Sequence, residues 1–255
     1  MNKILVIGDS CTDVFIYGDC YRLNPEAPTP VLKENYKKEY EGMAANVVNN
    51  VRALGLDCDF ITQKENIIKT RFVDEKSNYV LLRIDNDNLI TPLSCAPLSW
   101  ADTLDYSNYD LVIISDYNKG FLSENFLIYV FKYSKLTFID TKKAIGDWMK
   151  NATYIKINES EYSNPKNDLD FIKNHKQKFI ITIGEGGALY NDLIYKPKRT
   201  VTVRDVVGAG DSFLAAIACH YYIHKNIIRA IKFANVCAGE VVAQKGIAFP
   251  KQKLL

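Results

Sequence analysis

The sequence predicts a doubly wound α/β fold built on a mostly parallel sheet. Short β-branched apolar runs alternate along the chain with helical stretches, which is the pattern of a parallel sheet covered by helices on both faces. A second set of segments alternates apolar and polar residues, as strands with one face in water do. The chain has 255 residues, 47% of them hydrophobic, which suffices for one large core. We therefore expect a single domain over residues 1–255.

Five apolar runs are the expected parallel strands: Ile4–Ile7, Leu111–Ser115, Thr137–Asp140, Tyr154–Asn158 and Phe179–Ile183. The expected helices are Ala44–Leu54, Glu124–Tyr133, Leu169–Asn174 and, near the C-terminus, about Asp211–His224 and Ile227–Gln244. Ligands of a doubly wound sheet bind at the carboxyl ends of its strands. Four residues fall at these predicted ends: Asp116, Asp140, Asn158 and Gly184.

The alternating segments are Val14–Tyr17, Val31–Glu34, Thr70–Val73 and Tyr79–Ile84. No linker, low-complexity tract or internal repeat separates them from the apolar strands. They are therefore expected to be an insertion within one domain and not a second folding unit.

Composition excludes several classes of function. The net charge is +2, from 32 Lys and Arg against 30 Asp and Glu, so no global field favours nucleic acid. No apolar run approaches the ~20 residues that span a bilayer, and the N-terminus enters a strand instead of a signal peptide. We expect a cytoplasmic protein without a membrane partner. The six cysteines form no Cys-x-x-Cys pair and are expected to be reduced core side chains.

The most informative stretch is Asp205–Phe213, which contains Gly208-Ala209-Gly210-Asp211 ahead of an apolar, small-residue helix. Two glycines one residue apart permit a tight turn with exposed N–H groups, and a helix N-terminus adds to such an anion site. Asp211 stands where a general base would face the anion, so the stretch suits phosphoryl transfer. The alternative is a glycine turn with a capping Asp. No Gly-x-x-x-x-Gly-Lys-Ser/Thr sequence occurs, which excludes a P-loop.

This stretch resembles the C-terminal signature of the ribokinase/PfkB family of sugar kinases. Four further motifs of that family precede it along the chain, in the order that the family shows: Ile4–Asp9 with Asp13, Glu41–Val47, Asn158–Glu161 and Thr182–Gly187. The resemblance implies a ribokinase-like fold whose small β-sheet lid, drawn from about residues 12–40 and 70–86, covers the sugar. It also implies ATP and Mg²⁺ as cofactors, a small-molecule sugar or sugar phosphate as partner, and a homodimer formed through the lids.

The resemblance assigns roles to single residues. Asp211 is the general base, and the N–H groups of Gly208, Ala209 and Gly210 stabilise the transferring phosphoryl group. Asp13, Gly42 and Asn46 bind the sugar, unless Asn46 satisfies backbone donors at a helix start. On the cofactor side, Asn158 and Glu161 organise the magnesium shell, Glu161 through water, unless they only begin a helix. The remaining nucleotide-binding candidates are Thr182, Gly184, Gly187, Lys142 and Asn235, the last with a purely local role as its alternative.

Within the family, the chain most resembles the bacterial heptose-7-phosphate kinase branch (D-glycero-β-D-manno-heptose 7-phosphate). Asn24–Val31 resembles its Pro-Glu-Ala-Pro segment, Ser115–Gly120 its Ser-Asp-Tyr-x-Lys-Gly segment, and Ile139–Lys142 its Asp-Pro-Lys element. A phosphorylated substrate requires cationic partners. The candidates are Arg71, Arg83 and Lys119, and ordinary lid-surface charge is the alternative for each.

The chain departs from the family pattern at two places. Gly42-Met43 stands where the family shows paired glycines, so a side chain there is expected to narrow the sugar pocket or to shift its specificity. Between Gly55 and Arg71 the chain lacks a β-α unit and the Gly-x-Asp segment. No nucleotidyltransferase domain is expected after the last helix. The expected function is an ATP-dependent kinase of heptose 7-phosphate, with a ribose- or fructose-like substrate, or a non-catalytic binding protein, as alternatives.

Overall fold

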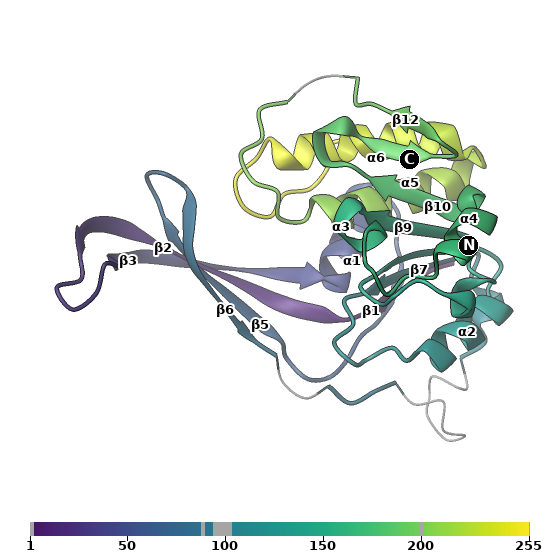
Figure 1. The fold of residues 1–255 in the computed structure, drawn as a ribbon, viewed down its shortest axis with the longest axis horizontal. Coiled ribbons are helices and arrows are strands. Elements are labelled where there is room, and N and C mark those ends of the chain that lie inside the picture. The colour runs from purple at the N-terminus through teal and green to yellow at the C-terminus, as the bar shows by residue number, and fades with distance from the viewer. Residues whose placement is uncertain (1–2, 88–89, 94–103, 199–200, 255) are drawn as a thin grey trace.

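The computed structural model describes residues 3–87, 90–93, 104–198 and 201–254 (Figure 1). Its large sheet has the strand order β12-β11-β10-β9-β8-β7-β1-β4. The strands are β1 (Ile4–Gly8), β4 (Asp59–Ile61), β7 (Leu111–Asp116), β8 (Thr137–Thr141), β9 (Tyr154–Asn158), β10 (Phe179–Thr182), β11 (Ala188–Tyr190) and β12 (Leu193–Tyr195). Across the sheet from β4 to β10 every neighbouring pair is parallel, and the pairs β10-β11 and β11-β12 are antiparallel. Among the described strands of this sheet, β11 therefore runs against all the others. The predicted mostly parallel sheet is confirmed.

Helices cover both faces of this sheet, as the doubly wound prediction requires. One face carries α1 (Ala44–Ala53), α5 (Ala209–His224) and α6 (Ile227–Val242), and the other carries α2 (Glu124–Tyr133) and α4 (Leu169–Asn174). Successive strand side chains point to opposite faces. Val6 therefore packs with the first helix layer, and its neighbour Ile7 packs with the second.

A second sheet, the lid, projects from this body (Figure 1). Its order is β3-β2-β5-β6, with β2 (Ser10–Leu23), β3 (Pro30–Met43), β5 (Ile68–Asp74) and β6 (Tyr79–Asn86). Phe15, Tyr17 and Val73 anchor it by packing against Ile247 and Val207 of the body. The predicted lid is confirmed, but β2 and β3 each have 14 residues. The prediction found only short pieces of them, because the solvated arm carries polar residues on both faces and loses its alternation.

The region between Gly55 and Arg71, which is shorter than the family pattern, connects the large sheet to the lid in a simple way. After α1 the chain forms only β4, at the edge of the sheet, and then enters the lid at β5 without an intervening helix. Sequence analysis missed β4, β11 and β12, because three-residue strands are too short to show a period. Five cysteines are free thiols, as expected, and the sixth, Cys95, falls outside the described residues. In the described part of the chain, every helix is too short or too polar to cross a bilayer.

Candidate active site

The winding of the sheet places a ligand site beside β1. The sheet continues from β1 to β4 on one side and, through β7, to β10 on the other. The carboxyl ends of strands that diverge in this way form the crevice in which doubly wound proteins bind ligands. Asp9 follows β1 directly, and Asp116 ends β7. Asp140 and Asn158 also lie at strand ends, as predicted, and Gly184 follows β10 by two residues.

Asp211, the predicted base, lies in the first turn of α5 and is 5% exposed. Each of its carboxylate oxygens has a hydrogen-bond donor. Asn46 Nδ2 donates to Oδ2 at 2.8 Å, and the Tyr117 hydroxyl donates to Oδ1 at 2.9 Å. Asn46 makes no cap for α1, which has no side-chain cap at all, so its alternative role at the helix start is wrong. The structure instead joins the predicted sugar-binding amide to the predicted base.

The surroundings of Asp211 tune its acidity to near neutral pH. Burial disfavours the charged form and raises the pKa of Asp211 to about 6, although the hydrogen bonds from Asn46 and Tyr117 act in the opposite direction. Asp140 raises this pKa further and Lys156 lowers it. Desolvation therefore outweighs hydrogen bonding. A carboxylate of this kind is ionised at pH 7 and still basic enough to accept a proton.

The predicted anion loop forms the expected tight turn, but one of its three amides, that of Ala209, already has a protein acceptor and is not free for a phosphoryl group. Gly208 is the N-cap of α5 with φ of 78°, a conformation that glycine adopts without steric cost. The Ala209 amide donates to Val206 O at 3.3 Å, whereas the amides of Gly208 and Gly210 have no protein acceptor among the described residues. Lys156 Nζ lies 3.3 Å from the position that a Gly210 Cβ would occupy. Two free amides, a helix N-terminus and a buried ammonium thus converge beside the base.

Sequence analysis missed Tyr117 and Lys156. Lys156 is 3% exposed within β9, and its ammonium pairs with Asp140 at 2.5 Å. The signal was a single lysine in an otherwise apolar strand, since buried lysines are rare unless paired. Tyr117 lies inside the segment that resembles Ser-Asp-Tyr-x-Lys-Gly. Its contact with Asp211 joins residues 94 positions apart, which a linear sequence does not reveal.

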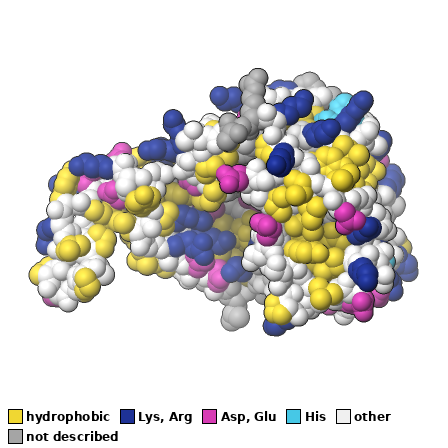
Figure 2. Space-filling view, turned by 45° about the horizontal axis from the view of Figure 1, so that its top comes forward, with side chains coloured by type: hydrophobic (Ala, Val, Ile, Leu, Met, Phe, Trp, Pro, Cys, Tyr) yellow, Lys and Arg dark blue, Asp and Glu magenta, His cyan; other side chains and the backbone are white. Residues whose placement is uncertain are grey.

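The acceptor-side residues lie where the lid leaves the body, and Lys and Arg side chains gather in the hollow there (Figure 2). Asp13 is buried and forms an ion pair with Arg71. Gly42 packs against Asp13, because an added Cβ would lie 2.0 Å from Asp13 Oδ2. Arg83 pairs with Asp85 on the lid at 2.8 Å, and Lys119 pairs with Asp87. The predicted sugar carboxylate and one predicted phosphate-binding arginine therefore neutralise each other.

On the nucleotide side, Asn158 and Glu161 form a capping box for the short helix α3 (Glu159–Tyr162). Asn158 Oδ1 accepts from the Glu161 amide, and Glu161 Oε2 accepts from the Asn158 amide, each at 2.8 Å. Glu161 also forms an ion pair with Lys142. The helix-start alternative is therefore observed, and it leaves the expected magnesium role untested.

The residues around Glu161 could hold magnesium in only one arrangement, in which the ion keeps most of its waters. No group of three or more His, Cys, Asp or Glu side chains gathers for a metal within the described ranges. A single carboxylate suits an ion that keeps its waters and is bound chiefly by nucleotide phosphates, as Mg²⁺ often is. Glu161 fits that arrangement.

The other nucleotide candidates have structural partners of their own. Thr182 Oγ1 donates to Ile157 O at 3.3 Å, and Asn235 Nδ2 donates to Tyr195 O at 2.7 Å, which is the local role considered for it. Gly187 faces Tyr195 O so closely that an added Cβ would lie 2.2 Å away. Open space surrounds Gly184 instead. Their roles toward a nucleotide stay predictions.

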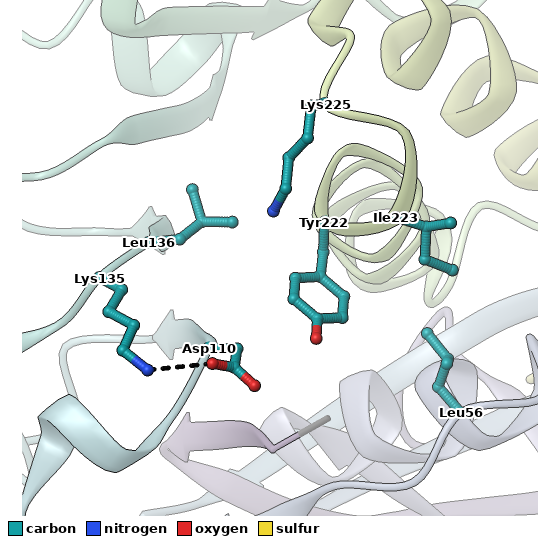
Figure 3. Close-up of a pocket in the computed structure, with 7 residues that line it drawn as sticks. All are labelled: Leu56, Asp110, Lys135, Leu136, Tyr222, Ile223 and Lys225. Carbon is teal, nitrogen blue, oxygen red and sulfur yellow. Dashed lines mark hydrogen bonds and ion pairs between the residues drawn. The ribbon is translucent and has the colours of Figure 1, made fainter. Parts of the chain in front are cut away.

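A separate pocket lies at the other end of the sheet (Figure 3). Asp110 and Leu136, which line it, immediately precede β7 and β8, so it opens at the amino ends of the strands. Lys135 pairs with Asp110 at 3.0 Å, and Lys225 and Tyr222 complete its polar lining. None of the predicted site residues borders this pocket.

Comparisons with known proteins agree with the predicted family. Residues 122–254 match the sequence profile described as pfkB family carbohydrate kinase. The chain is 30% identical to the bifunctional protein HldE of Nitratiruptor sp., with 96% of this chain and 62% of that protein covered. It is 31% identical to the bifunctional protein HldE of Campylobacter curvus, with the same two coverages. The chain thus spans less than two thirds of the length of these relatives.

Solved structures show the same fold. A ribokinase from Arabidopsis thaliana, complexed with ribose and ATP, superposes with a TM-score of 0.73 at 16% identity, covering 97% of this chain and 95% of that one. The ribokinase of Thermotoga maritima gives a TM-score of 0.72 at 17% identity with the same coverages. These likenesses confirm the ribokinase-like fold. The profile match, which spans more than half of the sequence, shows that the chain belongs to the pfkB family of carbohydrate kinases.

Proposed function

We propose that this chain transfers the γ-phosphoryl group of ATP to a hydroxyl of a sugar, with Asp211 as the general base. The observation that carries the proposal is the site at the start of α5. A buried, hydrogen-bonded carboxylate stands there beside the Lys156 ammonium and two glycine amides that have no acceptor in the described part of the protein. Membership of the pfkB family supports the same reaction class. A protein that only binds sugar has no chemical need for this combination.

The residues suggest how the transfer would proceed. Asp211 in its ionised form accepts the proton of the acceptor hydroxyl, whose oxygen then bonds to the γ-phosphorus. The bond between that phosphorus and the bridging oxygen breaks, and ADP leaves with the electron pair. The amides of Gly208 and Gly210, the dipole of α5 and Lys156 stabilise charge on the transferring group. Magnesium bound with the nucleotide would neutralise phosphate charge, and Glu161 is the residue that would hold its water shell.

The proposed substrate is heptose 7-phosphate. Three segments that resemble the heptose-7-phosphate kinase branch support it, and two of them contribute to the site: Ser115–Gly120 carries Tyr117, and Ile139–Lys142 carries Asp140. The reported relatives named bifunctional protein HldE agree with this choice. Arg83 and Lys119 are the proposed phosphate contacts, since only exposed or partly exposed carboxylates engage them. Arg71 would act on the substrate indirectly, by holding the carboxylate of Asp13 that is proposed to bind the sugar.

We also propose that two copies associate through their lids. All eight residues of β6 are exposed, and β6 is an edge strand of the lid. Long exposed edges with apolar side chains are sites at which chains pair.

The test of the kinase proposal is ADP release with Mg-ATP across a panel of sugars that includes heptose 7-phosphate. We expect turnover that requires one sugar and falls about 10²–10⁴-fold in Asp211→Asn. Asp170→Asn, which removes an exposed carboxylate on α4, is the matched control and should leave turnover unchanged. Turnover of a ribose- or fructose-like sugar alone would replace the heptose. Folded protein that binds ATP but turns over no sugar would favour the non-catalytic alternative.

A further inference from the structure

The hydroxyl of Tyr117 lies against the carboxylate of Asp211. This hydroxyl donates to Asp211 Oδ1 at 2.9 Å, while Asn46 occupies Oδ2 from α1. A carboxylate offers about four lone-pair positions, so these two donors fix its orientation and leave room to accept a proton. The acceptor hydroxyl must approach the same carboxylate beside the phenol.

Buried charges fix the turn that carries Tyr117. Asp9 Oδ2 accepts from the Tyr117 amide at 2.7 Å, and Asp116 Oδ1 accepts from the Asn118 amide at 3.0 Å. Asp116 is itself held by Lys143 at 2.7 Å and by the Thr141 hydroxyl at 2.5 Å. Two strand ends, β1 and β7, thus determine where the phenol stands.

Two lysine ammonium groups also restrain the ring of Tyr117. Lys69 Nζ lies 5.1 Å and Lys142 Nζ 5.5 Å from the ring centre. Both distances fall within the range of cation–π attraction. A phenol restrained at its backbone, its ring and its hydroxyl has little freedom to leave Asp211.

We propose that Tyr117 is a positioning residue for the base Asp211: its hydroxyl orients the carboxylate and keeps it ionised while the acceptor binds. This inference rests on the proposed kinase function. Burial raises the pKa of the phenol far above 10, so it remains a donor at every working pH. The other charged or titratable groups that act on Asp211 are Asp140, Lys156, Lys142 and Cys11. Tyr117 is the only one of the groups named in this paragraph that donates a hydrogen bond to it in the described structure.

Tyr117→Phe tests the inference, because it keeps the ring near the two lysines and removes only the hydroxyl. We expect kcat to fall about tenfold to a hundredfold, with the KM for ATP unchanged. The acidic limb of the kcat–pH profile should move upward by about one pH unit, because the ionised carboxylate loses a donor. Tyr133→Phe is the matched control, since that ring is 44% exposed on α2, and it should change none of these values.

A second measurement needs no turnover. In ¹³C-labelled protein without substrate, the carboxyl resonance of Asp211 should titrate about one pH unit higher in Tyr117→Phe than in the unmodified chain. Equal titration of the two proteins overturns the inference, whatever the activity. An upward shift in a chain that phosphorylates no sugar supports the positioning role and contradicts the proposed kinase function. A melting temperature near that of the unmodified chain verifies that the variant is folded.

Discussion

At the scale of single residues, the site depends on how strongly burial acts on Asp211. Two hydrogen bonds and Lys156 favour its charged form, but burial and Asp140 outweigh them, which leaves a pKa of about 6. A group with such a pKa changes charge within the range in which most enzymes are assayed. In the proposed reaction its protonation state affects activity, and in the folded chain it affects stability. The direction in which each changes with pH can be measured.

The first prediction concerns activity. A general base must be ionised, so kcat for the proposed reaction should be constant above about pH 7 and fall tenfold per pH unit well below the Asp211 pKa of about 6. The measurement is kcat against pH from 4.5 to 8.5 with saturating sugar and Mg-ATP. A profile that stays flat down to pH 5 would show that Asp211 is not the base or that its pKa is ordinary.

The second prediction concerns stability. In the folded chain the pKa of Asp211 is raised from 3.8 to about 6, so the folded state binds the proton more tightly than the unfolded state does. The contribution of Asp211 to the stability of the chain therefore decreases as pH rises from about 4 to 6, by up to about 3 kcal/mol for a shift of this size. Asp211→Asn removes this penalty.

We expect Asp211→Asn to be more stable than the unmodified chain at pH 8 and to lose that advantage as pH falls to 4. Urea unfolding at several pH values measures the difference. Asp170→Asn should give a difference that hardly varies with pH, because its carboxylate is exposed. A variant that is less stable than the unmodified chain at pH 8 would mean that the hydrogen bonds of Asp211 outweigh its desolvation.

Sequence analysis predicted the part of the site that is continuous in the chain. Gly208 and Asp211 are three residues apart, and their conformation follows from local chemistry. The partners of Asp211 were not predictable in the same way. Asn46 reaches it across 165 positions and Tyr117 across 94, so only the folded sheet reveals that they meet.

At the scale of elements, the start of α1 departs from ordinary backbone geometry. Met43 is its N-cap, with φ of 59° and ψ of −130°, a region that side chains other than glycine rarely adopt. The side chain is nevertheless buried against Cys11 and Ile67, and Lys69 Nζ lies 3.1 Å from its sulfur. The glycine that the family shows here would avoid the strain, so packing must offset it in this chain.

The third prediction compares Met43→Gly with Met43→Ala. Loss of the buried side chain should destabilise either variant by about 2–5 kcal/mol. Alanine keeps the unfavourable φ, whereas glycine relieves it, so the glycine variant should be about 1 kcal/mol more stable than the alanine variant. Urea unfolding of the two variants measures the difference. An alanine variant at least as stable as the glycine variant would contradict the strained conformation of Met43, because glycine is also the better of the two residues at an ordinary N-cap.

Burial on both faces made the central strands of the large sheet predictable. Strands such as Leu111–Ser115 and Tyr154–Asn158 are covered on both faces and appear as apolar runs in the sequence. Two lid strands, β2 and β3, extend far beyond their predicted ends. In β3 most residues are exposed on both sides, so no apolar pattern marks its bounds. Without burial, no selective pressure on polarity marks where such a strand begins.

At the scale of the whole molecule, the two faces of the lid differ. Arg71 lies opposite Arg83 on the face that holds Asp13, toward the site. Side chains one position away point to the other face, where Phe72 lies opposite Leu82 and Thr70 opposite Ile84. Leu82 is 55% exposed and Ile84 49%. A contiguous apolar face on a projecting sheet is unusual in a monomer, and a second lid of the same kind is the simplest partner for it.

The last prediction follows from that face. If two lids pair, the chain should sediment at about twice its mass of 29.0 kDa, and a charge at the centre of the contact should separate the copies. Leu82→Asp places an unpaired carboxylate there and should yield a monomer at micromolar concentration. Leu193→Asp is the control, because Leu193 is 61% exposed on β12, in the other sheet. If the unmodified chain sediments as a monomer, the lid serves its own site only, and its outer face needs another explanation. If both variants remain dimers, the contact lies elsewhere on the molecule, since an apolar interface does not accept a buried charge without a partner.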